Sequence, residues 1–204
     1  MKIMPPELEA WAQRNQNQIK SITDLSKDDS HPQDDWCSSK CTAYNFDSII
    51  NKYCQRRHKE SFCSVDAISI IGDVVSFIEF KNCVLNKKEI TNIKRKIAES
   101  TRYFEKIVMD SCFFSIRDIK TRFILVYGNN AYNGSDSYQN INQNIVNYAG
   151  RSNPIECKVK TVEDYCQILK YFDDVKILSS NEFISDISKY AYSIYDTDDL
   201  TTSA

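Results

Sequence analysis

Two carboxylates and one ammonium stand at a spacing that suits chemistry on phosphate. Twelve residues separate Asp66 from Glu79, and Lys81 follows two positions later. Hard cations such as Mg²⁺ prefer carboxylate oxygens, and an ammonium beside them can hold a phosphate or polarise a water molecule. Together these groups are the ones that metal-assisted hydrolysis of a phosphodiester requires.

A β-hairpin is predicted to bring these three side chains together. Two apolar runs, 62–71 and 74–81, flank Gly72 and Asp73, and glycine at the first central position suits a type II′ turn. Such a turn places the two carboxylates opposite each other, with the lysine on the same face. Opposed acids repel unless a positive group lies between them, which favours a bound divalent cation. The alternative is an ordinary amphipathic hairpin, but both acids stand in hydrophobic sequence, where carboxylates are seldom buried unpaired.

The pattern resembles that of the PD-(D/E)xK nuclease superfamily, which includes restriction endonucleases and archaeal Holliday junction resolvases. In that superfamily an acid on one strand is followed by acid-x-Lys on the next, as Asp66 is followed here by Glu79-Phe80-Lys81. The resemblance covers roughly residues 44–127. One position departs from the pattern, because Val65 stands where the family often has proline.

The resemblance implies an α/β fold with a restriction-endonuclease-like core, in which helices flank a mixed β-sheet. It implies a metal-dependent nuclease acting on DNA rather than RNA, with Mg²⁺ or Mn²⁺ held by Asp66, Glu79 and the backbone carbonyl of Phe80. Lys81 would orient or deprotonate the attacking water. Glu79→Gln and Lys81→Ala are each expected to abolish cleavage without unfolding the protein. Because the two acids repel, Glu79→Gln should also keep or slightly raise the stability of the metal-free protein.

A helix is predicted over residues 44–57, where apolar residues recur at helical spacing. The superfamily's first helix often supplies one more acid, for which Asp47 is the first candidate and Glu60 the second. Arg56 and Arg57 at the helix end are candidates for nucleic-acid contact, although cations are also favoured there by the helix dipole. The family core also has a strand before the first acid, and residues 57–66 leave little room for it.

A long helix is predicted from Lys87 to about Val108, with Asn86 and Glu89 as a capping box. Its buried stripe is expected to comprise Ile90, Ile93, Ile97, Phe104 and Ile107. Its other faces are expected to carry Lys87, Lys88, Lys94, Arg95, Lys96 and Arg102. The resemblance makes Lys94 and Arg95 candidates for nucleic-acid binding, and a solvated helix face is the alternative.

Strands and helices are expected to alternate through the C-terminal half. The predicted elements are a buried strand at Arg122–Tyr127, a polar loop at 128–137, a helix at Tyr138–Tyr148, a strand at Ile155–Val159, a helix at Thr161–Tyr171 capped by Thr161 and Asp164, a strand at Val175–Leu178, and a helix from Ser179 to about Tyr192. The sequence therefore predicts one domain at 41–195. It is expected to follow a polar, partly disordered tail or linker at 1–40 with a short helix at Glu7–Ile22, and to precede a frayed acidic end at 196–204.

The small net charge of −2 conceals an uneven distribution of charge. Residues 51–125 carry 15 basic and 9 acidic side chains, whereas the rest of the chain carries 11 and 19. A basic surface around the hairpin would favour a nucleic-acid partner, for which the resemblance implies DNA, although solvated helix faces explain the excess equally well. No signal peptide or membrane-spanning run is present, so an intracellular protein without a membrane partner is expected. The oligomeric state is left open, a homodimer included.

The eight cysteines are scattered, and reduced thiols are expected. Cys37-x3-Cys41 and Cys54-x3-His58 contain four ligands of types that zinc accepts, with His31 as a weaker substitute. Spacings of x3 are less typical than x2, so structural zinc is not expected. Two alternatives to the nuclease remain: a catalytically silent nuclease fold that binds nucleic acid or acts as a scaffold, and a zinc-stabilised interaction module.

Overall fold

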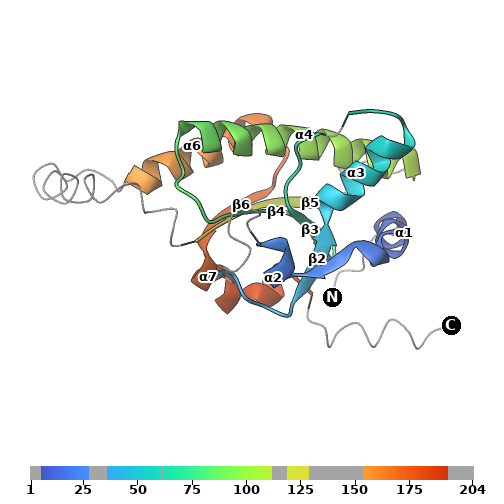
Figure 1. Cartoon of the computed structure of the whole chain (residues 1–204), viewed down its shortest axis with the longest axis horizontal. Coiled ribbons are helices and arrows are strands. Elements are labelled where there is room, and N and C mark those ends of the chain that lie inside the picture. The colour runs from blue at the N-terminus through green and yellow to red at the C-terminus, as the bar shows by residue number, and fades with distance from the viewer. Residues whose placement is uncertain (1–5, 28–35, 61, 112–118, 129–153, 193–204) are drawn as a thin grey trace, which may run out of the picture.

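A single mixed β-sheet organises the chain, with helices on both of its faces (Figure 1). The computed structural model describes residues 6–27, 36–60, 62–111, 119–128 and 154–192. Six strands follow one another across the sheet in the order in which they occur in the sequence. The predicted α/β class, with a mixed sheet flanked by helices, is confirmed.

The sheet is antiparallel in its first half and parallel in its second. Its strands are β1 (Ile19–Ser21), β2 (Thr42–Asn45), β3 (Ala67–Ile71), β4 (Val74–Lys81), β5 (Lys120–Tyr127) and β6 (Asp174–Ser179). A two-residue turn joins β3 to β4, whereas the parallel pairs need helical crossovers to bring the chain back to the same end of the sheet.

The β3–β4 hairpin has the predicted register. Ala67 lies opposite Ile78 and Ile71 lies opposite Val74. Gly72 has a φ of 60°, a value that L-residues other than glycine adopt only at a cost. The turn therefore fixes which residues of the two strands face each other.

Replacing Gly72 with alanine is expected to lower the free energy of unfolding by about 1–2 kcal/mol, because alanine pays for the positive φ. Urea denaturation of the metal-free protein measures the loss. Gly72→Asn is the matched control. Asparagine adopts a positive φ at a lower cost than alanine, so this variant should lose less unfolding free energy than Gly72→Ala. Equal stability of the wild type and the alanine variant would show that the turn is not held in this conformation.

The helices form two layers, one on each face of the sheet (Figure 1). One face is covered by α1 (Pro6–Arg14), α3 (Phe46–Arg56), α4 (Lys87–Ser111) and α6 (Pro154–Leu169). The other face carries α2 (Ile22–Leu25) and α7 (Ser180–Ser185). Two short 3-10 segments, η1 (Gln16–Gln18) and η4 (Ile187–Lys189), complete the described elements. The hairpin is therefore buried on both sides.

The longest described helix, α4, begins as predicted and packs through its predicted stripe. The side chain of Asn86 accepts a hydrogen bond from the Glu89 amide at 3.0 Å. The five predicted apolar positions are all buried: Ile90, Ile93, Ile97, Phe104 and Ile107. Phe104 stacks edge-on against Trp11, Phe46 and Phe77, so α4 joins α1, α3 and β4 in one aromatic core.

The N-terminal segment is part of the domain, so the predicted tail at 1–40 is wrong for its described residues. The predicted helix ends at Arg14 instead of Ile22, and the chain then forms β1 at the edge of the sheet. Leu8 and Trp11 are 0% and 1% exposed. A few large apolar side chains suffice to fix this otherwise polar stretch to the core.

The predicted strand at residues 155–159 is wrong, because this stretch is the start of α6. Thr161 consequently lies inside the helix and cannot cap one there. Alternation of apolar residues over only five positions does not separate a strand from a helix. The helical spacing becomes plain further on, where Val162 and Cys166 are both buried.

The strand missing from residues 57–66 is supplied from upstream. β2 occupies the first positions of the predicted 44–57 helix and pairs with β3. The helix itself starts at Phe46, where the side chain of Asn45 accepts the Ser48 amide at 2.9 Å. The element order α3–β3–β4–α4–β5 then follows as predicted.

The end of the described chain agrees with prediction in part. β6 contains the predicted strand, and Ser179 and Glu182 form the predicted capping box. The final helix ends at Ser185, well before Tyr192. The predicted helix at 138–148, most of the 128–137 loop and the acidic end at 196–204 lie outside the described residues.

No helix among the described residues has both the length and the apolarity needed to cross a membrane. Six cysteines in the described part of the chain are free thiols: Cys37, Cys41, Cys54, Cys63, Cys83 and Cys166. The side chains of Cys112 and Cys157 are not among those that the structure describes.

Candidate functional site

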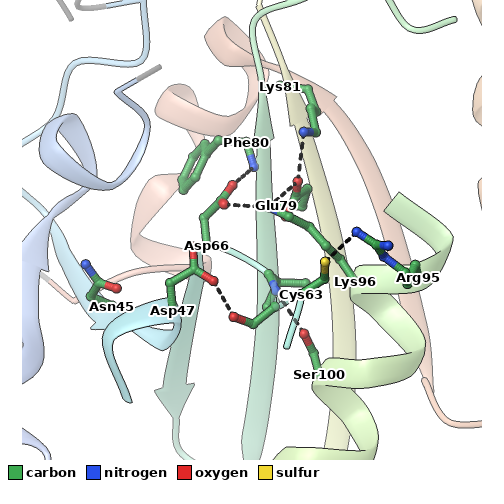
Figure 2. A network of polar contacts seen from close by, with 12 residues as sticks. Asn45, Asp47, Cys63, Asp66, Glu79, Phe80, Lys81, Arg95, Lys96 and Ser100 are labelled. Atoms are coloured by element: carbon green, nitrogen blue, oxygen red, sulfur yellow. Dashed lines mark hydrogen bonds and ion pairs between the residues drawn. The ribbon is translucent and has the colours of Figure 1, made fainter. Parts of the chain in front are cut away.

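The open end of the hairpin places the two predicted acids on one face of the sheet (Figure 2). Asp66 directly precedes β3, Glu79 lies within β4, and Lys81 is the last residue of β4. The backbone amide of Phe80 donates to Asp66 Oδ2 at 2.7 Å, which holds this carboxylate against β4. The predicted juxtaposition of the acids and the lysine is therefore present.

A second lysine, Lys96 of α4, fills the space between the two acids. Its Nζ lies 2.9 Å from Asp66 Oδ1 and 2.9 Å from Glu79 Oε1. The expectation that Lys96 lies on a face of α4 away from the buried stripe is therefore wrong. Its neighbours along one side of the helix, Ile93 and Ser100, are fully buried, so this side faces the sheet. The chain itself thus supplies the positive charge that the opposed carboxylates need.

Glu79 is the most deeply buried member of this group, with 0% exposure. Burial and the nearby Asp66 charge outweigh the opposing effect of Lys96 and Lys81 and raise the pKa of Glu79 to about 8. Within the described residues its Oε1 accepts no hydrogen bond of good geometry, although the two ammonium nitrogens lie within 3.3 Å. A further positive charge beside Glu79 would therefore be favourable.

Lys81 links the buried acid to the surface. Its Nζ lies 3.3 Å from Glu79 Oε1 and 3.3 Å from Glu89 Oε2, and its side chain is 17% exposed. Burial alone would lower the pKa of Lys81, but the surrounding carboxylates, Glu79 foremost, raise it. For Lys96 likewise, the Asp66 and Glu79 charges overcome burial and raise the pKa. Both lysines are thus ammonium ions at neutral pH.

The raised pKa of Glu79 gives a pH-dependent stability with a defined sign. A carboxyl group with a raised folded-state pKa stabilises the fold below its unfolded value, and this contribution is lost as pH rises through the folded value. Between about pH 4.5 and 8, the metal-free wild type should therefore lose stability relative to Glu79→Gln. Melting temperatures of both proteins across this range, in EDTA, test the expectation. A glutamine variant that is sharply less stable at every pH would make Glu79 a structural ion-pair member.

Asp47 lies in the first turn of α3 and accepts a hydrogen bond from the Ser64 hydroxyl (Figure 2). The adjoining Phe46 amide donates to the backbone oxygen of Asp66 at 3.1 Å, so α3 is tied to the start of β3. Among the described residues, however, no three His, Cys, Asp or Glu side chains are placed to hold one metal ion. Asp47 thus contacts the segment that leads into β3, and Glu60 lies exposed beyond the end of α3, so their part in a metal site stays a prediction.

The donor set suits a hard cation, but Lys96 stands where that cation would bind. Asp66 and Glu79 offer carboxylate oxygens, the ligands that Mg²⁺ prefers. An ammonium 2.9 Å from each acid leaves no space for a metal bound by both, so Lys96 must withdraw first. The side chain of Phe80 points to the opposite face and packs against Trp36, and its carbonyl remains only a predicted ligand.

The arginines expected to bind nucleic acid lie at the exposed end of α3. Arg56 and Arg57 are both exposed, as phosphate contact would require. The Arg57 guanidinium lies over the Tyr53 ring at 4.7 Å from its centroid. This cation–π contact orders the side chain but leaves its edge accessible.

The two basic candidates on α4 also make contacts within the chain. Lys94 Nζ lies 5.4 Å from the centroid of the Tyr165 ring in α6. Arg95 is exposed, and its Nη2 lies 2.6 Å from Cys63 Sγ (Figure 2). Their roles in nucleic-acid binding stay predictions.

The four residues considered for zinc do not converge. Cys37 packs among the side chains on the α2 and α7 face of the sheet, whereas Cys54 packs on the α3 and α4 face. The sheet therefore separates the two halves of the set. His31 lies outside the described residues.

Comparison with known proteins gave no match for this chain at any of three levels: no family model, no curated protein and no solved structure matches it. The chemistry of the site must therefore be argued from its own residues.

Proposed function

We propose that the protein is a metal-dependent nuclease that hydrolyses phosphodiester bonds, in DNA rather than RNA. The observation that carries the proposal is the meeting of Asp66, Glu79 and Lys81 on one face at the end of β4. The element order α3–β3–β4–α4–β5 adds support, because it matches the order of the restriction-endonuclease-like core except for one strand, since β2 precedes α3 here. The partner is then nucleic acid, and the cofactor is Mg²⁺ or Mn²⁺.

Each side chain has a distinct task in this proposal. Asp66 and Glu79 would hold the cation, which when bound supplies a Lewis acid and an activated water. Lys81, as an ammonium, would bind a phosphate oxygen and stabilise the charge that develops at phosphorus. Lys96 keeps the two acids together in the metal-free protein and would withdraw when the cation binds.

Cleavage of defined nucleic acids tests the proposal directly. Linear and circular DNA, single-stranded DNA and RNA are incubated with Mg²⁺, Mn²⁺ or EDTA, and products are separated on gels. Degradation is expected with either cation and none with EDTA. Products from circular DNA would establish endonucleolytic cutting. Cleavage that persists in EDTA, or its absence with both cations on every substrate, would overturn the proposal.

A second candidate is a catalytically silent nuclease fold that binds nucleic acid or acts as a scaffold. It is favoured by Lys96, because this ammonium pairs with both acids without any metal. In that case Mg²⁺ and Mn²⁺ should leave the melting temperature unchanged, since a cation stabilises only a fold that binds it. A rise in melting temperature with either cation would speak against this candidate.

A further inference from the structure

A pocket of about 390 Å³ opens beside Asp66 and Lys81. Its wall combines residues 25–27 and Trp36 from the N-terminal segment with residues 80–83 from the end of β4. Small-molecule sites typically measure roughly 300–1,000 Å³, so one flat ring system fits. The pocket thus adjoins the candidate catalytic groups, and it exists only because the N-terminal segment folds onto the sheet.

The aromatic wall of this pocket is held in position on three sides. The indole N–H of Trp36 donates to the Ser26 carbonyl at 2.8 Å. Its ring meets Phe80 edge-on, with centroids 6.2 Å apart and planes at 76°. Behind it, a Cβ added to Gly128 would lie 2.7 Å from Trp36 Cε3, so the glycine backbone itself presses on the ring. A half-buried aromatic ring fixed in this way can receive a ligand without being reordered.

Several of the other lining side chains are polar, and they include both hydrogen-bond donors and acceptors. Lys81 and Asn82 provide hydrogen-bond donors, and Glu89 provides acceptors. Lys27 stands at the same pocket and pairs with Asp24 through an exposed contact of 3.2 Å. A purely apolar ligand would leave these groups unmatched, whereas a nucleobase offers an aromatic face together with donors and acceptors at its edge.

We infer that this pocket takes one unpaired nucleobase of a nucleic-acid strand, stacked on Trp36, beside the phosphate that the candidate site would cleave. The inference rests on the proposed function and narrows its substrate to single-stranded or flipped-out nucleotides. A base inside a duplex has both faces covered by its neighbours, so it must leave the stack before it can meet the indole. Lys27 and Lys81 both line the pocket and would supply ammonium groups to the phosphates of the strand.

Tryptophan fluorescence reports on this stacking, because the chain contains only Trp11 and Trp36. Trp11 is 1% exposed in the core, so a ligand should affect only Trp36. In EDTA, which prevents metal-dependent hydrolysis, a single-stranded oligonucleotide is expected to quench the wild type and Trp11→Phe but not Trp36→Phe. A blunt duplex of the same sequence should not quench. Equal quenching by the duplex, or quenching retained in Trp36→Phe, overturns the inference.

Affinity gives a second measurement. Loss of base stacking in Trp36→Leu should weaken single-strand binding by roughly 5- to 150-fold in fluorescence anisotropy. Circular dichroism confirms that the variant is folded, and Trp36→Phe, which keeps an aromatic ring, should recover part of the affinity. Unchanged affinity in Trp36→Leu overturns the inference. So does saturable binding of free nucleoside monophosphates without any binding of strands.

The two proposals can fail separately. Quenching by single strands without cleavage in Mg²⁺ or Mn²⁺ would retain the nucleobase pocket and reject the nuclease. The opposite result is cleavage that depends on Glu79 but runs at the same rate in Trp36→Leu, with no fluorescence quenching by single strands. That result would support the nuclease proposal and rule out the nucleobase pocket.

Discussion

The Glu79→Gln variant is expected to cleave nucleic acid at least about 10²–10⁴-fold more slowly than the wild type with Mg²⁺. Glutamine keeps the shape of the side chain but removes the charge that would hold the cation. The residue is 0% exposed and lies between two ammonium groups. Initial rates on a labelled oligonucleotide measure the loss. Lys81→Ala should show a loss of similar size through missing charge stabilisation at phosphorus.

Two exposed residues provide matched controls. Glu9→Gln makes the same chemical change on α1, and Lys88→Ala makes the lysine change on α4. Both should cleave at the wild-type rate. Circular dichroism at the assay temperature separates lost chemistry from lost structure. Wild-type rates in folded Glu79→Gln would remove the acid from the proposed mechanism.

The Lys96→Met variant is expected to lose about 3–5 kcal/mol of unfolding free energy above pH 8 in the absence of metal. Methionine is close to lysine in length but removes the ammonium that lies between Asp66 and Glu79. The loss should shrink toward pH 5, where Glu79 can take up a proton instead, since its pKa is already raised. Urea denaturation at both pH values measures the difference.

The same variant separates the metal site from a purely structural network. With the ammonium between the two acids removed, Mg²⁺ or Mn²⁺ should raise the melting temperature of Lys96→Met more than that of the wild type. Lys88→Met, an exposed lysine on the same helix, should behave like the wild type. A destabilised Lys96→Met that no divalent cation rescues would favour the silent nuclease fold.

The hairpin was predictable because its determinants are local. A glycine at the turn and two runs of apolar residues fix the register, and the register alone brings Asp66 to Glu79. Lys96 was not predictable in the same way, since it stands in a basic run on an amphipathic helix. Its helical spacing from Ile93 and Ser100 could have placed it on the side that faces the sheet. A charged residue next to a buried stripe is, however, usually predicted to be exposed to solvent.

Two errors in the prediction of the fold have a common physical origin. The N-terminal segment has few apolar residues, yet Leu8 and Trp11 contribute fully buried side chains that no local pattern announces. In residues 155–159 apolar and polar side chains alternate as in a strand, but these residues belong to α6. The helix is stabilised because Val162 and Cys166, at helical spacing, are buried against the rest of the domain. In both places contacts with residues far apart in the sequence decide the local structure, and a short segment of sequence does not reveal those contacts.

The brevity of β1 bears on how the protein avoids aggregation. A long, open sheet edge offers unpaired amides and carbonyls to other chains, and very short edge strands reduce that hazard. β1 has three residues and covers Thr42–Tyr44 of β2. A shortened protein that began at residue 41 would uncover these backbone groups together with the hollow left by Trp11. The N-terminal segment, which resembles a dispensable tail in sequence, thus reduces the tendency of the protein to self-associate.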